Sequence, residues 1–139
     1  MYNIFIFIIS FYFLLVSVLG YGNLFKKFVL NNIDFDENLD VLTGFYGLTF
    51  LTLISLITSF VFEHNFYHNT ILHLIGFLYF CFNNLKKNKK YLKNIFFISI
   101  FCISILLISK THDDFSYYHF PFTKYLTENH VIFGMGNLN

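Results

Sequence analysis

The sequence lacks arginine, alanine, glutamine and tryptophan, and it contains only one proline and two cysteines. Charged residues are also scarce, at 12% of 139 residues, while hydrophobic residues reach 56%, a balance unlike that of soluble domains. The net charge of +1 leaves no basic surface, so nucleic-acid binding is not expected. The lipid bilayer is therefore the expected partner of this chain.

The two cysteines, Cys81 and Cys102, lie inside apolar runs. A thiol in such a run usually packs as a small hydrophobic group. Their spacing matches neither a disulfide framework nor a Cys/His zinc motif. No structural role in metal binding or crosslinking is expected for them.

Long apolar runs predict an all-α membrane fold with about four transmembrane helices. The expected spans cover about residues 3–21, 42–62, 67–85 and 93–110, within a helical region 1–111. Each approaches the roughly 20 residues needed to cross a bilayer. No lysine precedes the first run, which favours a span over a signal peptide. The third run is short and contains His73, so a re-entrant or interfacial segment is its alternative.

Glycines mark the expected turns and close contacts. Gly20 and Gly22, like Gly134 and Gly136, begin a dinucleotide-binding pattern but do not complete it, and we interpret both pairs as turns. The polar stretch 22–40 is expected to be a loop, with a short interfacial helix as an option. In the second run, Gly44 and Gly47 would allow another helix to approach closely.

One dense lysine cluster predicts the orientation. Lys86, Lys87, Lys89, Lys90 and Lys93 lie between the third and fourth runs, so the positive-inside rule places that loop in the cytoplasm. Crossing the fourth span then places the segment 112–139 outside the cell. If the third run also crosses, the connection around residues 63–68 lies outside as well.

The strongest candidates for chemistry are the adjacent carboxylates Asp113 and Asp114, which follow the last apolar run. They could hold a divalent metal ion, or one could act as a general base, with His119 nearby. Adjacent residues point the same way only in a turn. The alternative is that either aspartate caps a helix that begins near Phe115. Pro121 would then break or turn that helix.

A second polar cluster contains Glu63, His64 and His68. The two histidines would share a face of a continuous helix, but the order of residues is not that of an HExxH zinc motif. The alternative is a set of polar residues at a hairpin. If both connections are external, this cluster could meet Asp113 and Asp114. His73, inside an apolar run, is expected to be a hydrogen-bonded packing residue unless it is an intramembrane site.

The segment His112–Pro121, with Leu126–Thr127 and Gly134–Asn137, resembles part of large multi-pass bacterial envelope proteins. The residues around Gly20–Gly22 and Glu63–Gly76 resemble the amino-terminal part of the same proteins. In outline these proteins are similar to GT-C glycosyltransferases, which transfer sugars from polyprenyl-phosphate donors at the external membrane face.

The resemblance implies a multi-pass protein of the bacterial inner membrane that uses a lipid-linked sugar donor. In GT-C enzymes an external acidic residue is the essential base or metal partner, and Asp113 and Asp114 match it here, although they follow the fourth run instead of the first. We therefore expect the amino-terminal part of a glycosyltransferase of surface-polysaccharide assembly, interrupted within segment 112–139. The alternative is a non-enzymatic membrane protein, either a transporter fragment or a small interaction subunit.

Overall fold

The computed structural model describes residues 2–29, 41–84, 89–108 and 113–132, and this part of the chain is helical without strands. In chain order the helices are α1 (Tyr2–Val29), α2 (Val41–Ser59), α3 (Phe66–Asn84), α4 (Lys89–Ile108), the one-turn 3-10 helix η1 (Asp113–Phe115) and α5 (His119–Glu128). The expected all-α fold is confirmed. Helices α2, α3 and α4 lie within a few residues of three expected spans.

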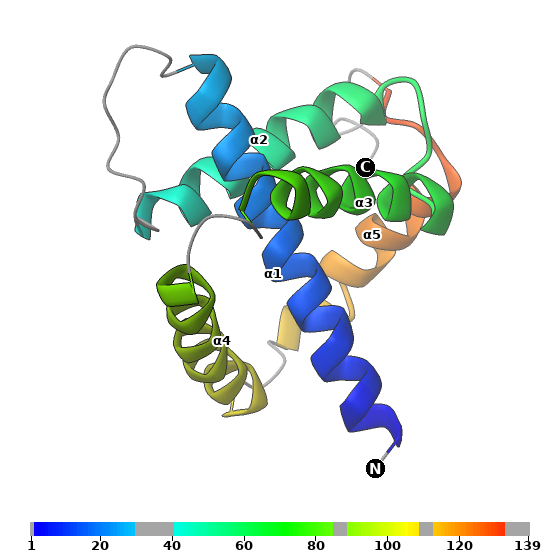
Figure 1. Cartoon of the computed structure of the whole chain (residues 1–139). Coiled ribbons are helices and arrows are strands. Elements are labelled where there is room, and N and C mark those ends of the chain that lie inside the picture. The colour runs from blue at the N-terminus through cyan, green and yellow to red at the C-terminus, as the bar shows by residue number, and fades with distance from the viewer. Residues whose placement is uncertain (1, 30–40, 85–88, 109–112, 133–139) are drawn as a thin grey trace.

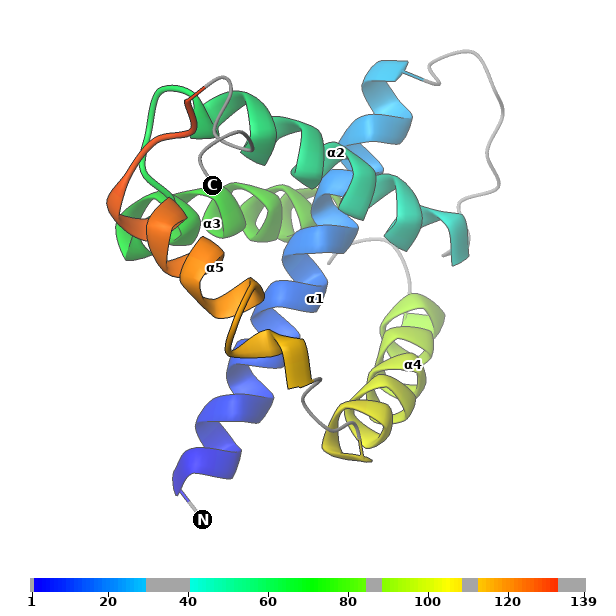
Figure 2. The ribbon, with the colours of Figure 1, turned by 180° about the vertical axis from the view of Figure 1, so that it is seen from behind.

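Helix α1 is the centre of the fold because it packs against both α2 and α3. Helices α2 and α3 form a hairpin that holds α1 between its two arms, with α3 on one side and α2 on the other (Figures 1 and 2). The amino-terminal half of α1 projects out of this arrangement (Figure 1). The carboxyl-terminal half therefore provides most of the packing surface.

The contact between α1 and α3 requires two glycines. A Cβ atom on Gly20 would collide with the backbone carbonyl oxygen of Gly76. A Cβ atom on Gly76 would lie 2.7 Å from both Ser17 Oγ and Tyr21 Cδ2. Small residues let helix backbones approach closely, which is how helices associate where apolar surroundings supply no hydrophobic driving force.

The contact between α1 and α2 uses glycine in the same way. A Cβ atom on Gly22 would collide with the carbonyl oxygen of Thr43, and one on Gly47 would collide with that of Val18. The expected close approach at Gly47 is therefore confirmed. Gly44 does not share this role, because a Cβ atom there would have no neighbour within 4 Å.

Polar side chains connect the same three helices inside the apolar bundle. A buried polar group costs free energy unless it has a hydrogen-bond partner, so these pairs stabilise one register of the helices. The pairs are Ser17 Oγ with His73 Nδ1 at 3.2 Å, Tyr21 Oη donating to Leu72 O at 2.7 Å, and Lys26 Nζ donating to Thr43 Oγ1 at 2.7 Å. The expectation that His73 is a hydrogen-bonded packing residue is confirmed.

Helix α4 touches the bundle along a narrow strip. Ile95 is buried with Leu19 of α1 and Phe80 of α3. One helical turn further along α4, Ser99 Oγ lies 2.6 Å from Tyr12 Oη of α1. Most other described side chains of α4 are exposed, and α4 stands beside α1 below the hairpin (Figure 1).

Helix α1 is longer than the sequence predicted. It continues without interruption to Val29, so the expected end near residue 21 and the expected loop over residues 22–29 are wrong. The interpretation of Gly20 and Gly22 as a turn is also wrong, because both lie inside α1 and serve helix contacts. Gly134 and Gly136 lie outside the described residues.

Two described helices are long and apolar enough to cross a membrane, namely the segments Ile4–Val29 and Leu42–Ser59. The segments Lys93–Ile108 and Asp113–Glu128 would add a third span only if taken as one, and they meet at 87°. Large apolar side chains are exposed along the outer faces, including Phe5 (64%) and Leu107 (72%). Such helices are suited to lipid rather than to water. The exposed apolar surface is therefore consistent with membrane association.

Candidate functional site

The acidic pair lies on the one-turn helix η1, and Asp113 and Asp114 are both exposed. The backbone of Asp114 closes the turn, because its carbonyl oxygen accepts hydrogen bonds from the N–H groups of Tyr117 (3.2 Å) and Tyr118 (3.0 Å). A 3-10 helix has three residues per turn, so neighbouring side chains diverge by about 120°. One carboxylate at a time can therefore face a given acceptor molecule.

The helix expected near Phe115 begins later, at His119. Tyr118 is its N-cap residue and makes no side-chain capping hydrogen bond. Neither aspartate is therefore the N-cap of α5. The expected break at Pro121 applied to a helix that starts near Phe115; in α5 Pro121 lies in the first turn, where its missing N–H would have no helical partner. His119 is exposed at the start of the helix, and its carbonyl oxygen accepts a hydrogen bond from Thr123 Oγ1 (2.7 Å).

The segment after η1 does reach the α2–α3 connection, but through the far end of α5. His64 N–H donates to the carbonyl oxygen of Leu126 (2.8 Å), and Val131 N–H donates to that of Ser59 (2.8 Å). These two backbone hydrogen bonds fix the end of α5 on the hairpin. The acidic pair lies at the opposite end of this segment (Figure 2). The connection around His64 was expected to meet Asp113 and Asp114, but its hydrogen bond is to Leu126.

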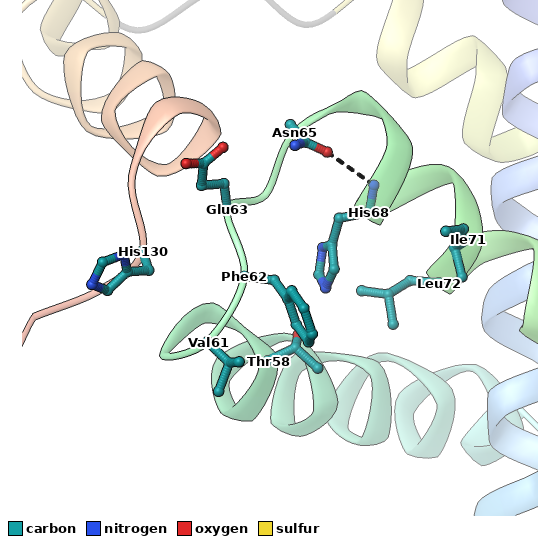
Figure 3. A pocket seen from close by; sticks show the side chains of 9 residues that line it. All are labelled: Thr58, Val61, Phe62, Glu63, Asn65, His68, Ile71, Leu72 and His130. Carbon is teal, nitrogen blue, oxygen red and sulfur yellow. Dashed lines mark hydrogen bonds between the residues drawn. The ribbon is translucent and has the colours of Figure 1, made fainter.

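A cavity of about 630 Å³ lies where the hairpin meets the end of α5. Its polar lining comes from α2, the connection, α3 and the segment after α5, and Figure 3 shows these side chains. They are Thr58, Glu63, Asn65, His68 and His130. The sequence singled out Glu63 and His68, whereas His130 was missed, because only the fold brings a residue after α5 to this hairpin. Asp113, Asp114 and His119 are not among its lining residues.

His64 of the connection and His68 of α3 form a group of neighbouring rings with Phe62, in which only the Phe62 and His68 rings are stacked. The ring centroids of His64 and His68 lie 4.7 Å apart, and those of Phe62 and His68 lie 6.0 Å apart. His64 Nε2 lies 3.1 Å from the carbonyl oxygen of Ser55, an arrangement that requires a proton on Nε2. Burial lowers the pKa of His64 below its ordinary value, and the His68 ring lowers it further, against the opposing effect of the Ser55 carbonyl.

His68, which lines the cavity, has one ring nitrogen without a hydrogen-bond partner among the described residues. Its backbone N–H is capped by Asn65 Oδ1 at 3.0 Å, which begins α3 locally. Its Nδ1 atom is buried and has no hydrogen-bond partner within the described part of the chain. Buried ring nitrogens are normally satisfied, so this atom is an unusual feature of the packing at the start of α3.

A divalent metal ion needs more ligands than the acidic pair supplies. Among the described residues, no group of three or more histidine, cysteine, aspartate or glutamate side chains could hold a metal ion. Calcium takes six to eight oxygen ligands and magnesium an octahedral set. The two exposed carboxylates on η1 therefore do not make a metal site with their described neighbours.

No curated protein and no solved structure matches this sequence. One family does match, over residues 4–139, which include all the described helices from α2 onward and nearly all of α1. Its description is a domain of unknown function (DUF8201). This chain belongs to the DUF8201 family.

Proposed function

We propose that this chain is part of a polytopic membrane protein of glycosyltransferase type that acts in bacterial surface-polysaccharide assembly. The observation that supports the proposal most directly is the exposure of Asp113 and Asp114 on a short turn that follows the apolar helix α4. A carboxylate at such a position is accessible to a water-borne or lipid-linked hydroxyl. The resemblance of residues 112–121 to multi-pass envelope proteins supplies the reaction class.

In this proposal one aspartate accepts the proton of an acceptor hydroxyl while the hydroxyl oxygen attacks the sugar carbon that carries the donor phosphate. The bond between that carbon and the phosphate oxygen breaks, and polyprenyl phosphate leaves with the electron pair. The other carboxylate points elsewhere because of the 3-10 geometry. His119, at the start of α5, would orient the acceptor through a hydrogen bond. Holding a metal ion near the donor phosphate is the alternative role of the acidic pair in this proposal.

The proposed topology has four spans in the bacterial inner membrane. The lysine-rich region 86–93 lies in the cytoplasm, and the segment from residue 112 onward lies outside. Helices α1 and α2 satisfy the length and composition of a span, and α3 and α4 have nearly the same length as α2. The external location gives Asp113 and Asp114 access to a donor that has crossed the membrane.

The test is a transfer assay with a radiolabelled polyprenyl-phosphate sugar in membranes that contain the full-length protein of which we propose this chain to be a part, because the isolated chain is expected to be inactive. We expect transfer that is lost when Asp113→Asn and Asp114→Asn are combined, by roughly the 10²–10⁴-fold that a general base contributes. Thr127→Ser, an exposed change on α5, is the matched control. Full transfer by the double asparagine variant, at equal protein level, would remove the acidic pair from the reaction.

A non-enzymatic membrane subunit is the second candidate function. The absence of a third metal ligand beside the acidic pair, within the described residues, favours it. So does an apolar groove of about 450 Å³ between the outer ends of α1 and α4, lined by side chains such as Phe7 and Leu107. Recovery of the protein in a stable complex, without any transfer activity, would select this function.

A further inference from the structure

We propose that His64 makes the docking of α5 on the α2–α3 hairpin sensitive to pH, so that α5 is held near neutral pH and released in acid. The inference does not depend on sugar transfer or on the acidic pair. It rests on the contacts that His64 makes with α2, α3 and α5, and on the neighbouring ring of His68.

The joint between α5 and the hairpin is held by few interactions. None of the side chains of α5 is buried. Two backbone hydrogen bonds join the segment to the hairpin, one from His64 N–H to Leu126 and one from Val131 N–H to Ser59. One hydrogen bond of this kind changes an equilibrium by about two- to tenfold. A modest change in free energy at the joint can therefore release α5.

His64 connects the joint to both arms of the hairpin. Its N–H donates to the carbonyl oxygen of Leu126 in α5 (2.8 Å), and its own carbonyl oxygen accepts a hydrogen bond from Asn69 Nδ2 of α3 (2.7 Å). Its ring Nε2 lies 3.1 Å from the carbonyl oxygen of Ser55 in α2. A displacement of this one residue therefore loosens the bond to α5 together with the other two.

A positive charge on His64 is unfavourable in the docked form. The ring is half-buried, and its centroid lies 4.7 Å from that of His68. Burial lowers the pKa of His64, the His68 ring lowers it further, and the Ser55 carbonyl opposes both effects only in part. In the released form the ring is surrounded by water, where the ordinary pKa of about 6.5 applies. Protonation of His64 therefore favours release.

A charge on His68 acts in the same direction. Two imidazolium rings at this separation repel each other. His68 Nδ1 is buried without a hydrogen-bond partner among the described residues, and a charged imidazole carries a proton on this atom. A buried charged N–H group without an acceptor costs free energy. Separation of the two rings relieves both costs, and it displaces His64 from the joint.

The other charged groups around the joint do not cancel these effects. Helix α2 carries no histidine and no charged residue. Among the described groups, only His68 changes the pKa of His64 by its charge. The Glu63 carboxylate is turned away from the His68 ring (Figure 3). The remaining titratable groups in the connection, the first turn of α3 and residues 124–132 are Glu63, Tyr67, Lys124, Tyr125, Glu128 and His130, all exposed except the half-buried Tyr125.

The direction and size of the effect follow from proton binding. The released form binds a proton on His64 more readily, so the docking constant decreases as the pH falls below about 6.5 and levels off below the lowered pKa of the docked form. One histidine can change this constant by at most about tenfold per pH unit. This range is comparable with the contribution of one backbone hydrogen bond. Release also removes His130 from the lining of the cavity at the hairpin.

Hydrogen exchange of the full-length protein in phosphatidylcholine nanodiscs tests the inference, because the N–H groups of His64 and Val131 make the two hydrogen bonds of the joint. Mass spectrometry measures their protection factors, relative to the intrinsic exchange rate at each pH. We expect both factors to decrease about three- to thirtyfold from pH 8 to pH 5, the upper value being tenfold per pH unit below 6.5. At every pH both groups should exchange faster than the amides of residues 17–21 in α1.

His64→Gln is the decisive variant, because it keeps an N–H donor for the Ser55 carbonyl and does not titrate. Protection of the Val131 amide should then be nearly independent of pH. His68→Phe should reduce the dependence, and it provides a second result if His64→Gln fails to fold. His130→Gln, an exposed change beside Val131, is the matched control and should keep the full decrease.

Three outcomes would overturn the inference. The first is equal protection of both amides at pH 8 and pH 5 in the unaltered protein. The second is protection equal to that of residues 17–21, because the joint would then open only when the whole bundle unfolds. The third is loss of the pH dependence in His130→Gln, which would assign the titration to His130.

Discussion

Gly20 of α1 and Gly76 of α3 touch backbone to backbone, with no room for a methyl group between them. The contact lies beside the polar pair Ser17 and His73, so apolar packing and hydrogen bonding act at one level of the bundle. This level fixes how α3 lies on α1. It should therefore respond sharply to small changes in volume.

Gly20→Ala is expected to destabilise the bundle by about 1–3 kcal/mol, the usual cost of forcing extra volume into a packed site. Gly44→Ala is the matched control, since its Cβ would meet nothing within 4 Å and alanine favours helix by up to about 1 kcal/mol. Thermal unfolding of both variants in detergent, followed by circular dichroism, measures the difference. Equal melting temperatures would show that α1 and α3 are not in close contact.

The hydrogen bond between Ser17 and His73 should appear as a coupling energy. Ser17 is completely buried, so Ser17→Ala leaves His73 Nδ1 without its partner. A double-mutant cycle with His73→Phe should give a coupling of about 0.6–1.5 kcal/mol. The phenylalanine ring can keep the edge contact that His73 makes with Phe13. A coupling near zero would mean that the two side chains do not interact.

Stability should fall with pH below neutrality because of His64. Its pKa is lowered in the folded protein, so the unfolded chain binds more protons at a pH between the folded pKa and the ordinary value of about 6.5. Stability then decreases as the pH drops through that window and is unaffected by this group above it. Melting temperatures between pH 8 and pH 5 measure the slope.

The control for this pH dependence is His64→Gln, which keeps an N–H donor for the Ser55 carbonyl but does not titrate. Its melting temperature should change less with pH than that of the unaltered protein. An identical slope in both proteins would assign the pH dependence to other groups.

The proposed topology predicts opposite labelling of two exposed positions. In a variant that lacks Cys81 and Cys102, Glu128→Cys should react with a membrane-impermeant maleimide in intact cells. Lys93→Cys, at the lysine-rich end of α4, should react only after the cells are opened. Reaction of Glu128→Cys only in opened cells would place α5 in the cytoplasm and remove the basis for an external acidic site.

The sequence predicted the helices well because apolar runs are a strong signal, and three of the four expected spans match α2, α3 and α4 within a few residues. It failed at Gly20 and Gly22, where local turn chemistry pointed to a break. The helix persists because those glycines contact Gly76 and Thr43, which are distant in the sequence. Local rules do not include such contacts.

In the candidate sites, too, the sequence predicted local features but not contacts between distant residues. The exposed position of Asp113 and Asp114 followed from the end of an apolar run, and it is found on η1. Of the cavity, the sequence predicted Glu63 and His68 but not His130. His130 is 62 residues from His68, and the backbone hydrogen bonds of Leu126 and Val131 bring it to the cavity. The position of His73 inside an apolar run predicted that its ring is hydrogen-bonded. The sequence did not identify Ser17 as the partner, because that contact depends on the fold.

The placement of α1 between α2 and α3 also sets an order of assembly during synthesis. The contact of Lys26 with Thr43 spans 17 residues, so α1 and α2 can pair early. The contact of Ser17 with His73 spans 56 residues, and it cannot form until α3 has been made. Until then, Ser17 lacks this partner, and its hydroxyl can bond only to a carbonyl oxygen of its own helix, so the final position of α3 on α1 is set after α1 and α2 have paired.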